Sequence, residues 1–181
     1  MPNLLLKDLP RYECLLEASK EFPDLDPSAC EAFLHLLRAG DESARVVETQ
    51  LARHNISQGR FGVLMILLNR CEGNAATLGP AELADAAGVS RATMTGLIDT
   101  LERDGLVTRD PDTVDRRMML VRLTDKGRAL LQAILPDHFK RMAWLMSPLS
   151  EFERQSLVQL LNKIQQQAGK FPEISATAVA G

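Results

Sequence analysis

The segment that most constrains the fold is residues 79–105, where two short helices are predicted on either side of a tight turn. Pro80 suits the first turn of a helix, because the N–H group that proline lacks has no partner at that position in any helix. Gly88 begins the turn, and Ser90 can cap the second helix, which Gly105 ends. Two short helices joined by a glycine-containing turn form the helix-turn-helix pattern.

Two short apolar runs follow directly, residues 106–109 and 118–123, and both are typical of β-strands. The segment between them is polar and rich in turn-forming residues, so the pair is predicted to form a β-hairpin with an exposed tip. A helix-turn-helix followed by such a hairpin is a winged helix. We therefore expect a mainly α chain (α+β) in which the small β-hairpin is the wing.

Apolar residues at helical spacing predict further helices on both sides of the winged helix. Asp26 and Pro27 are a good start for a long helix that runs to about Arg53, and Ser57 can cap the next one. Pro136 is expected to kink the first helix after the hairpin. The chain is accordingly divided into an N-terminal extension that could hold a short helix (1–27), a dimerisation helix (28–56), a winged helix-turn-helix DNA-binding domain (57–127), C-terminal dimerisation helices (128–168) and a disordered tail (169–181).

Rows of apolar residues on the terminal helices, within 130–135 and 157–164, flank a domain that scarcely needs them for its own core. An apolar helix face with nothing to cover in its own domain tends to pack against a second copy of the chain. A homodimer is therefore expected. Its two-fold symmetry would place the two DNA half-sites about one helical turn apart, roughly 34–36 Å.

The second helix of the helix-turn-helix has the features of a DNA-recognition helix. Its apolar face consists of Met94, Leu97, Ile98 and Leu101. Arg91 could make a bidentate contact with guanine, and Thr93 or Thr95 could contact a phosphate oxygen or a thymine methyl group. The positive end of the helix dipole also favours a phosphate nearby. On an isolated helix, ordinary solvent-exposed polar residues would explain the same pattern, but the hairpin that follows favours DNA recognition.

The predicted tip of the wing carries one acidic and two basic residues in succession, Asp115, Arg116 and Arg117. A hairpin beside a recognition helix can project along the DNA, where the negative potential of the minor groove attracts arginine. Asp115 could orient one guanidinium by a charge-assisted hydrogen bond, and either arginine could enter the groove. The residues predicted to contact double-stranded DNA are Ser57, Ser90, Arg91, Thr93, Met94, Thr95, Arg103, Asp115, Arg116 and Arg117. Met94 belongs both to this set and to the apolar face.

Composition and charge limit the other classes of protein to which the chain could belong. The net charge of −3 does not indicate nucleic-acid binding by itself, so a DNA-binding face must come from the local arrangement of charge. The longest apolar run, residues 63–68, is far shorter than the roughly 20 residues of a membrane span, and the N-terminus lacks a signal-peptide pattern. The three cysteines are widely spaced and without a CxxC motif, so we expect a cytoplasmic protein with reduced thiols and no membrane partner.

Metal ions, cofactors and catalysis are not predicted. His35, His54 and His138 are scattered without the spacing of metal ligands. The sequence shows no nucleophile elbow, phosphate-binding glycine loop or paired catalytic carboxylates, so an enzyme is a less favoured alternative. A winged helix that binds another protein is a third alternative, disfavoured because such a surface would be expected to expose aromatic residues.

The sequence resembles the MarR family of bacterial transcriptional regulators over roughly residues 28–168. The resemblance rests on three stretches in this order: residues 79–84 (GPAELA), residues 90–107 (SRATMTGLIDTLERDGLV), and residues 115–127, which begin with DRR and end with LTDKG. It implies a homodimer with interlocking terminal helices, each subunit presenting one winged helix to a pseudo-palindromic operator. It also implies release of the DNA when a small aromatic or phenolic ligand binds between the dimerisation helices and the winged helix.

Other members of this family sense peroxides through a cysteine, so a cysteine-based redox sensor of the same fold is the alternative regulator. A reactive thiol needs nearby positive charge or a helix N-terminus. Of Cys14, Cys30 and Cys71, only Cys30 lies near a predicted helix N-terminus, and Glu31 beside it acts in the opposite direction. We therefore expect all three to be buried structural cysteines.

Overall fold

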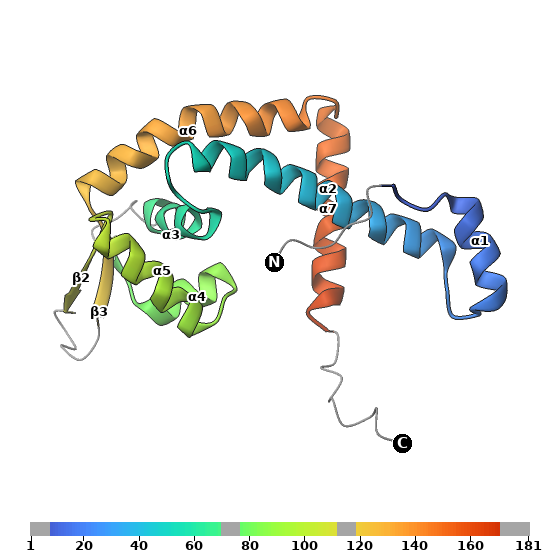
Figure 1. Ribbon diagram of the computed structural model, residues 1–181, viewed down its shortest axis with the longest axis horizontal. Coiled ribbons are helices and arrows are strands. Elements are labelled where there is room, and N and C mark those ends of the chain that lie inside the picture. The colour runs from blue at the N-terminus through green and yellow to red at the C-terminus, as the bar shows by residue number, and fades with distance from the viewer. Residues whose placement is uncertain (1–7, 70–76, 112–118, 171–181) are drawn as a thin grey trace, which may run out of the picture. The chain divides into compact units, whose positions relative to one another are not determined.

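The computed structural model describes residues 8–69, 77–111 and 119–170 (Figure 1). In order along the chain, the elements are α1 (Tyr12–Glu21), α2 (Pro27–Ala52), α3 (Gln58–Asn69), β1 (Thr77–Leu78), α4 (Pro80–Ala87), α5 (Arg91–Arg103), β2 (Val107–Pro111), β3 (Met119–Leu123), α6 (Asp125–Met146) and α7 (Glu151–Ala168). They fall into two compact units, Met1–Arg141 and Met142–Gly181. The expected fold class, mainly helical with a small wing, is confirmed.

The long helix α2 begins and ends where local side-chain chemistry indicates. The carboxylate of Asp26 accepts hydrogen bonds from the backbone N–H groups of Ser28 at 3.0 Å and Ala29 at 3.1 Å, with Pro27 inside the first turn. After the helix ends, Asn55 adopts a φ of 53°, a left-handed conformation that asparagine tolerates better than most residues. The predicted long helix and the break after it are both confirmed.

Two glycines with left-handed backbones end the helices of the helix-turn-helix. Gly88 has a φ of 64° and follows α4, and the N–H of Val89 donates back to that helix. Gly105 has a φ of 71° and follows α5, and the N–H of Leu106 donates to the carbonyl of Leu101 at 2.9 Å. Glycine reaches this conformation without a steric penalty, so the chain can turn sharply at both positions. The predicted helix-turn-helix is confirmed.

The wing is built on a three-stranded antiparallel sheet in the order β1-β3-β2. β2 and β3 form the predicted hairpin, with Val107 opposite Leu123 and Pro111 opposite Met119. β2 continues past the predicted end of its strand, because pairing with β3 rather than the apolar pattern sets its length. β1 pairs with the other edge of β3 and was not predicted, since a two-residue strand is too short to show alternation.

One hydrophobic core joins the helix-turn-helix, the hairpin and parts of α2 and α6. The buried members of this core are Leu51, Ile56, Phe61, Val63, Leu64, Leu67, Leu78, Leu83, Ala84, Met94, Ile98, Leu101, Leu106, Val107, Val121, Leu123, Leu131 and Ile134. Leu51 from the end of α2 and Leu131 and Ile134 from α6 are almost completely buried. The expectation that the winged helix scarcely needs the apolar row within 130–135 is therefore wrong for Leu131 and Ile134. Apolar periodicity predicts that a helix has a face to bury, but not which surface covers it.

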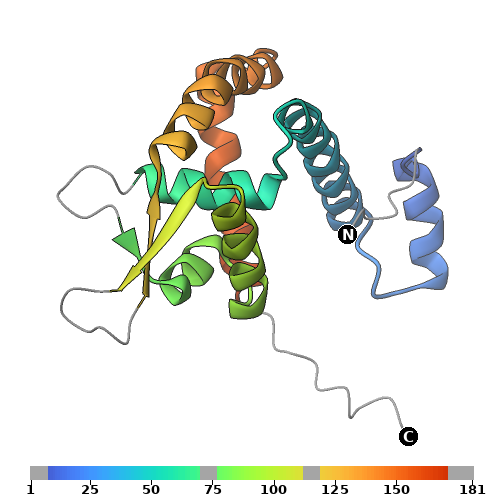
Figure 2. The same cartoon turned by 60° about the vertical axis from the view of Figure 1, so that its left-hand side comes forward.

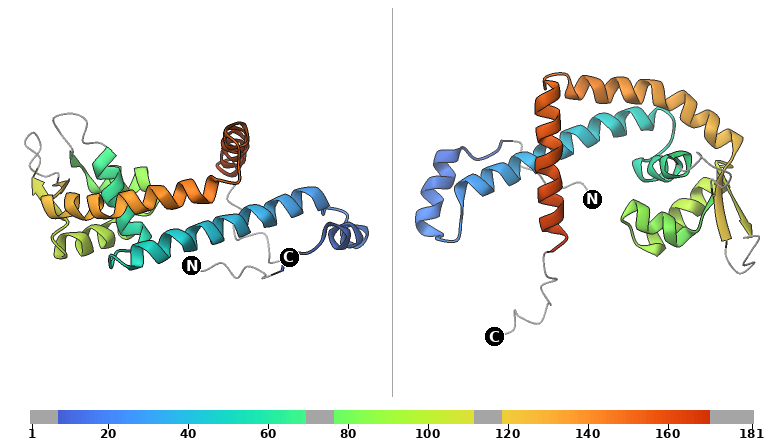
Figure 3. Two further views of the ribbon diagram at one scale, coloured as in Figure 1. Left: turned by 90° about the horizontal axis from the view of Figure 1, so that it is seen from above. Right: turned by 180° about the vertical axis from the view of Figure 1, so that it is seen from behind.

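A buried glutamine links α2 to α6. Gln50 has no exposed surface; its Nε2 donates to the carbonyl oxygen of Ile134 at 3.1 Å, and its Oε1 lies 3.1 Å from Nδ1 of His138. The two helices have opposite chain directions where this contact joins them (Figure 3). α6 contains Pro136, yet it is a continuous helix whose ribbon curves, so the predicted kink is a gradual bend (Figure 1).

The position of His138 makes stability depend on pH. Burial lowers the pKa of His138 below its ordinary value of 6.5, and the opposing effect of Asp137 is smaller. The unfolded chain therefore takes up a proton at a higher pH than the folded protein. Stability should fall as the pH is lowered through about 6.5 and become constant below the folded pKa. His138→Gln should remove this part of the pH dependence, measured as the urea midpoint at about pH 8 and about pH 5. An equal change of midpoint in the wild type and the variant would contradict this expectation.

α1, the first helix of the chain, contributes no residue to this core. α1 confirms the short helix expected in the N-terminal extension, and Leu15 is its buried residue. α7 lies in the second unit, begins with a capping box between Ser150 and Glu153, and buries none of its residues. Most of the predicted disordered tail lies outside the described residues, from residue 171 onward. Within the described ranges, no helix is long and apolar enough to cross a membrane.

Candidate DNA interface

The N-terminus of α5 is held by the predicted cap, Ser90. Its Oγ accepts a hydrogen bond from the backbone N–H of Thr93 at 3.1 Å and lies 2.9 Å from the Thr93 hydroxyl. The side chain thus satisfies one of the N–H groups that every helix leaves unpaired at its start. The positive end of the helix dipole lies at this same, exposed end of α5, which makes it a favourable place for a phosphate.

α5 divides its side chains between the core and the solvent. Met94 and Ile98 are fully buried, whereas Arg91, Thr93 and Thr95 are exposed. Met94 was also predicted to contact DNA, and this prediction is wrong, because a side chain with 0% exposure cannot reach a ligand outside the core. The exposed side chains are those expected of a helix that approaches a DNA groove closely: short groups with one long donor.

The hydroxyl of Thr95 already has a partner within the helix. It donates to the carbonyl oxygen of Arg91 at 2.9 Å. A phosphate oxygen could accept from Thr95 only in place of this carbonyl, because a hydroxyl has a single hydrogen. Of the two contacts left open by the sequence, the structure therefore favours the one between the Thr95 methyl group and a thymine methyl.

Ser57 and Arg103 were also predicted to contact DNA, and both lie at helix ends. Ser57 precedes α3, and its Oγ accepts from the backbone N–H of Arg60 at 3.4 Å, as a cap does. Arg103 is the last residue of α5, with a side chain that is 76% exposed. At a rise of about 1.5 Å per residue, Arg103 is roughly 18 Å along the axis from Arg91. These two arginines therefore cannot contact the same base pair.

The base of the hairpin packs beside α5 (Figure 2). There Arg109 of β2 forms ion pairs with two carboxylates of α5, those of Asp99 and Glu102. The sequence analysis missed Arg109, because a strand pattern does not indicate which helix a strand side chain will meet. The one available signal was that Asp99 and Glu102 are three residues apart and so share a helix face. The predicted wing-tip residues, Asp115, Arg116 and Arg117, lie outside the described residues.

A cavity of about 390 Å³ lies where the ends of α2 and α5 meet the starts of α3 and α6. Its lining combines apolar side chains with histidine, arginine and lysine. The lining residues are His54, Asn55, Ile56, Arg60, Asp104, Leu106, Lys126 and Leu130. The effector-binding residues were not predicted from the sequence, and this lining provides candidates.

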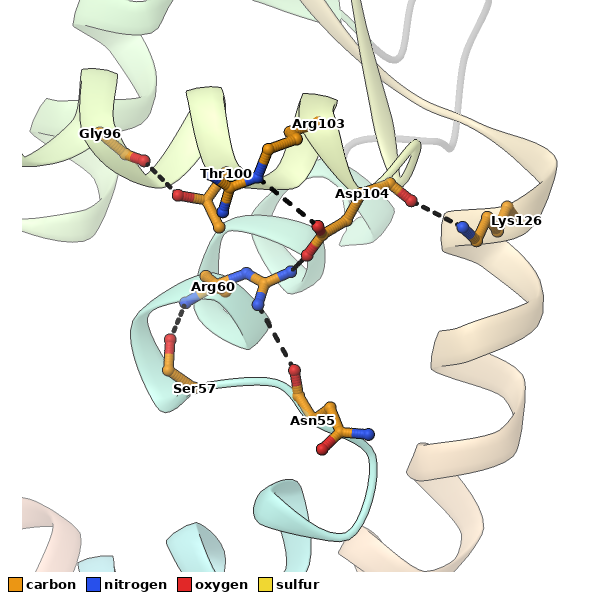
Figure 4. Close-up of polar contacts among 8 residues, drawn as sticks. All are labelled: Asn55, Ser57, Arg60, Gly96, Thr100, Arg103, Asp104 and Lys126. Atoms are coloured by element: carbon orange, nitrogen blue, oxygen red, sulfur yellow. Dashed lines mark hydrogen bonds and ion pairs between the residues drawn. The ribbon is translucent and has the colours of Figure 1, made fainter.

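Two cations of this cavity hold the C-terminal end of α5 (Figure 4). The guanidinium of Arg60 pairs with the carboxylate of Asp104, and its Nη1 donates to the carbonyl oxygen of Asn55 at 3.4 Å. Nζ of Lys126 donates to the backbone carbonyl of Asp104 at 2.7 Å. Within the described part of the chain, Nε of Arg60 is buried without a hydrogen-bond partner. Because Asp104 is the C-cap of α5, the cavity is connected directly to the helix.

The cysteines differ from what the sequence suggested. Cys14 is exposed on α1, so the expectation that it is buried is wrong; α1 instead turns Leu15 toward α2. Cys30 is partly exposed, and Cys71 lies outside the described residues. In the ranges that the structure covers, no group of three or more His, Cys, Asp or Glu side chains could hold a metal ion.

A helix-turn-helix with an exposed, capped second helix, followed by an antiparallel hairpin, defines a winged helix-turn-helix DNA-binding protein. The family model described as MarR matches residues 56–119. The HTH-type transcriptional repressor YetL of Bacillus subtilis (strain 168) is 33% identical over 168 residues, which are 93% of this chain and 99% of YetL. The chain belongs to the MarR family.

Two solved structures are similar in sequence and in fold. A mutant MarR from E. coli complexed with operator DNA has a TM-score of 0.68 at 27% identity, covering 78% of this chain and 98% of that one. BpsR of Bordetella bronchiseptica, whose DNA binding is regulated by 6-hydroxynicotinic acid, has a TM-score of 0.64 at 27% identity, covering 72% and 91% of the two chains. The chain is thus a DNA-binding transcriptional regulator, and family membership confirms the prediction that it is not an enzyme.

Proposed function

We propose that this chain is a homodimeric repressor that binds a pseudo-palindromic operator and leaves it when a small aromatic ligand binds. The observation that carries the proposal is the N-terminal face of α5, where Arg91 and Thr93 are exposed on a helix whose opposite face is buried. Two similar proteins support it, since YetL is named a repressor and the similar MarR structure contains operator DNA. Arg116 or Arg117 remains the predicted minor-groove contact of the wing, with Asp115 predicted to orient one guanidinium.

The dimer is supported by apolar side chains that are exposed in a single copy of the chain. α7 buries none of its residues, although it carries a row of large apolar side chains. The exposed residues of this row are Phe152, Leu157, Val158, Leu160 and Ile164. An apolar helix face that its own chain leaves uncovered is typical of an interaction site. A second copy would cover it and, through two-fold symmetry, present two copies of α5 to the DNA.

Binding of the full chain to its own promoter DNA, measured at several salt concentrations, tests this proposal. A protein that neutralises six to ten phosphates should lose roughly 10³- to 10⁵-fold in affinity between 50 and 200 mM salt. The operator should also bind at least about 10³-fold more tightly than random DNA of the same length. Light scattering should give the mass of two chains. Affinity that is insensitive to salt, or equal on the two DNAs, would refute DNA recognition.

The ligand proposal rests on the cavity beside the end of α5. Its volume of about 390 Å³ is within the range of sites for small organic ligands, roughly 300–1,000 Å³. Ile56 and Leu106 suit an aromatic ring, while Arg60 and Lys126 suit a carboxylate or phenolate. Asp104 is the partner of both cations, because its carboxylate pairs with Arg60 and its backbone carbonyl accepts from Lys126. An acidic ligand would displace it from both. The C-terminal end of α5 would then lose these polar contacts with α3 and α6, and the recognition helix could shift from its DNA-binding position.

Calorimetry with 6-hydroxynicotinic acid and salicylic acid as probes tests this site, with the corresponding amides as neutral controls. We expect each acid to bind at least about ten-fold more tightly than its amide, a difference of about 1.4 kcal/mol. Lys126→Met should weaken binding of the acids by a similar factor. Lys140→Met removes the same charge from an exposed position of α6 outside the cavity lining and should have no effect. Equal affinity for acid and amide, or equal effects of the two lysine variants, would contradict the assignment.

A further inference from the structure

Arg109 lies on the face of the wing that looks toward the recognition helix. In the hairpin it is opposite Val121, which is fully buried, and residues opposite each other in a sheet share one face. Its neighbours along β2, Thr108 and Asp110, lie on the other face, because successive strand side chains alternate. Of these three consecutive residues, only Arg109 is therefore directed at α5.

The guanidinium of Arg109 contacts α5 at two points. One of its Nη atoms pairs with Oδ1 of Asp99, and the other lies 2.8 Å from Oε2 of Glu102. Because the guanidinium is planar and its donors are fixed in a fork, two carboxylates restrain both its position and its rotation. Isolated surface ion pairs contribute little. Here, however, the arginine side chain is only 23% exposed and is shared by two partners.

The charges of this cluster argue against a direct DNA contact by Arg109. Its positive charge is matched by two negative ones, so the cluster as a whole repels phosphate. What Arg109 provides is a polar connection, beside the shared hydrophobic core, between β2 and the C-terminal half of α5. This connection affects DNA binding only if the hairpin and α5 contact the DNA at the same time.

We propose that Arg109 is a positioning residue that locks the β2–β3 hairpin to α5, so that the recognition helix and the wing meet the DNA as one rigid unit. The proposal rests on the DNA binding proposed above and adds the residue that sets the geometry between its two contacting elements. Without Arg109 the hairpin would stay packed on the core through Val107 and Val121, but it would no longer be held in one orientation against α5, so the contacts made by the wing would weaken. The base contacts made by α5 itself would remain.

Operator binding by the full-length Arg109→Gln variant tests this assignment. We expect affinity to fall roughly ten-fold, about 1.4 kcal/mol. The slope of log affinity against log salt should become less steep by about 0.9 for each lost phosphate contact. The melting temperature and dimer mass should stay close to those of the wild type. Arg122→Gln is the matched control, because Arg122 lies on β3 on the other face of the sheet and pairs with Asp110 of the same hairpin. Equal losses of affinity and slope in the two variants would overturn the proposal.

A second variant separates positioning from the simple neutralisation of charge. Arg109→Gln also uncovers Asp99 and Glu102, which repel phosphate. The triple variant with Asp99→Asn, Glu102→Gln and Arg109→Gln removes that repulsion without restoring the connection, and we expect it to bind less tightly than the wild type. Wild-type affinity in the triple variant would show that Arg109 acts by charge alone and would overturn the proposal that it is a positioning residue.

Arg109→Lys keeps the test decisive if the glutamine variant does not fold. An ammonium group can pair with one carboxylate but cannot bridge two in the same way, so this variant should lose part of the affinity and part of the slope. Wild-type behaviour of Arg109→Lys would then count against the proposal. Failure of the wild-type chain to bind DNA in a salt-dependent way would instead refute the proposed function, and the two failures are thus distinguishable.

Discussion

Replacing Arg91 with alanine should cost about 1–3 kcal/mol of operator binding, which is a roughly 5- to 150-fold weaker complex. Arg91 is the first residue of α5 and is exposed beside the capping residue Ser90. Its truncation therefore removes a long donor at the end of the helix where bases are expected, without opening the core. The affinity for the operator should fall far more than the affinity for random DNA. Competition between the two DNAs, measured by fluorescence anisotropy, gives this preference directly.

Arg91→Lys distinguishes base recognition from the effect of charge. Lysine keeps the positive charge but not the planar fork that pairs with a guanine edge. The affinity for random DNA should therefore stay close to that of the wild type, while the preference for the operator falls. If Arg91→Ala kept the full preference for the operator, Arg91 would have no part in base recognition.

Replacing Gly127 with alanine should destabilise the fold, although alanine is the better helix former. A Cβ atom at this position in the first turn of α6 would lie 2.3 Å from the carbonyl oxygen of Leu106 and 2.8 Å from Cδ1 of Leu123. The carbonyl cannot shift freely, because it accepts a hydrogen bond from the N–H of Thr124 at 3.1 Å. Overpacking of this kind costs about 1–3 kcal/mol. Each kcal/mol lowers the melting temperature of a chain of this size by roughly 2–4 °C.

Gly62→Ala is the matched control for this substitution. Gly62 also lies in a helix, α3, but a Cβ atom built there has no neighbour within 4 Å. This variant should gain up to about 1 kcal/mol from helix propensity. Calorimetric scans of the two variants should therefore move in opposite directions. A melting temperature of Gly127→Ala at or above that of the wild type would show that α6 does not approach the hairpin so closely.

The parts of the fold that follow from local chemistry could be predicted from the sequence. Asp26 and Ser90 cap helices with their own side chains, and Gly105 ends one by adopting a left-handed conformation. Each of these events involves only residues a few positions apart. The same is true of the exposed polar face of α5, because the period of the helix separates it from the apolar face.

The parts that could not be predicted depend on contacts between distant segments. The three residues separating Asp99 from Glu102 are visible in the sequence, but their shared partner, Arg109, depends on how the hairpin packs. The two-residue strand β1 exists only because β3 offers it an edge. Met94 was assigned to both faces of α5, and its complete burial shows that it belongs to the core. Periodicity therefore identifies faces, while tertiary packing assigns their partners.

The core described above extends beyond the winged helix at both ends, and this determines the shortest piece of the chain that can fold alone. Leu51 precedes the winged helix, Leu131 and Ile134 follow it, and all three are almost completely buried. Losing a large buried side chain costs about 2–5 kcal/mol, and a small domain has only about 5–15 kcal/mol in total. A fragment limited to residues 57–127 would therefore lose most of its free energy of unfolding, because these three buried side chains would be missing. An autonomous DNA-binding fragment has to keep the end of α2 and α6 up to about His138, so the piece that folds is longer than the piece that touches DNA.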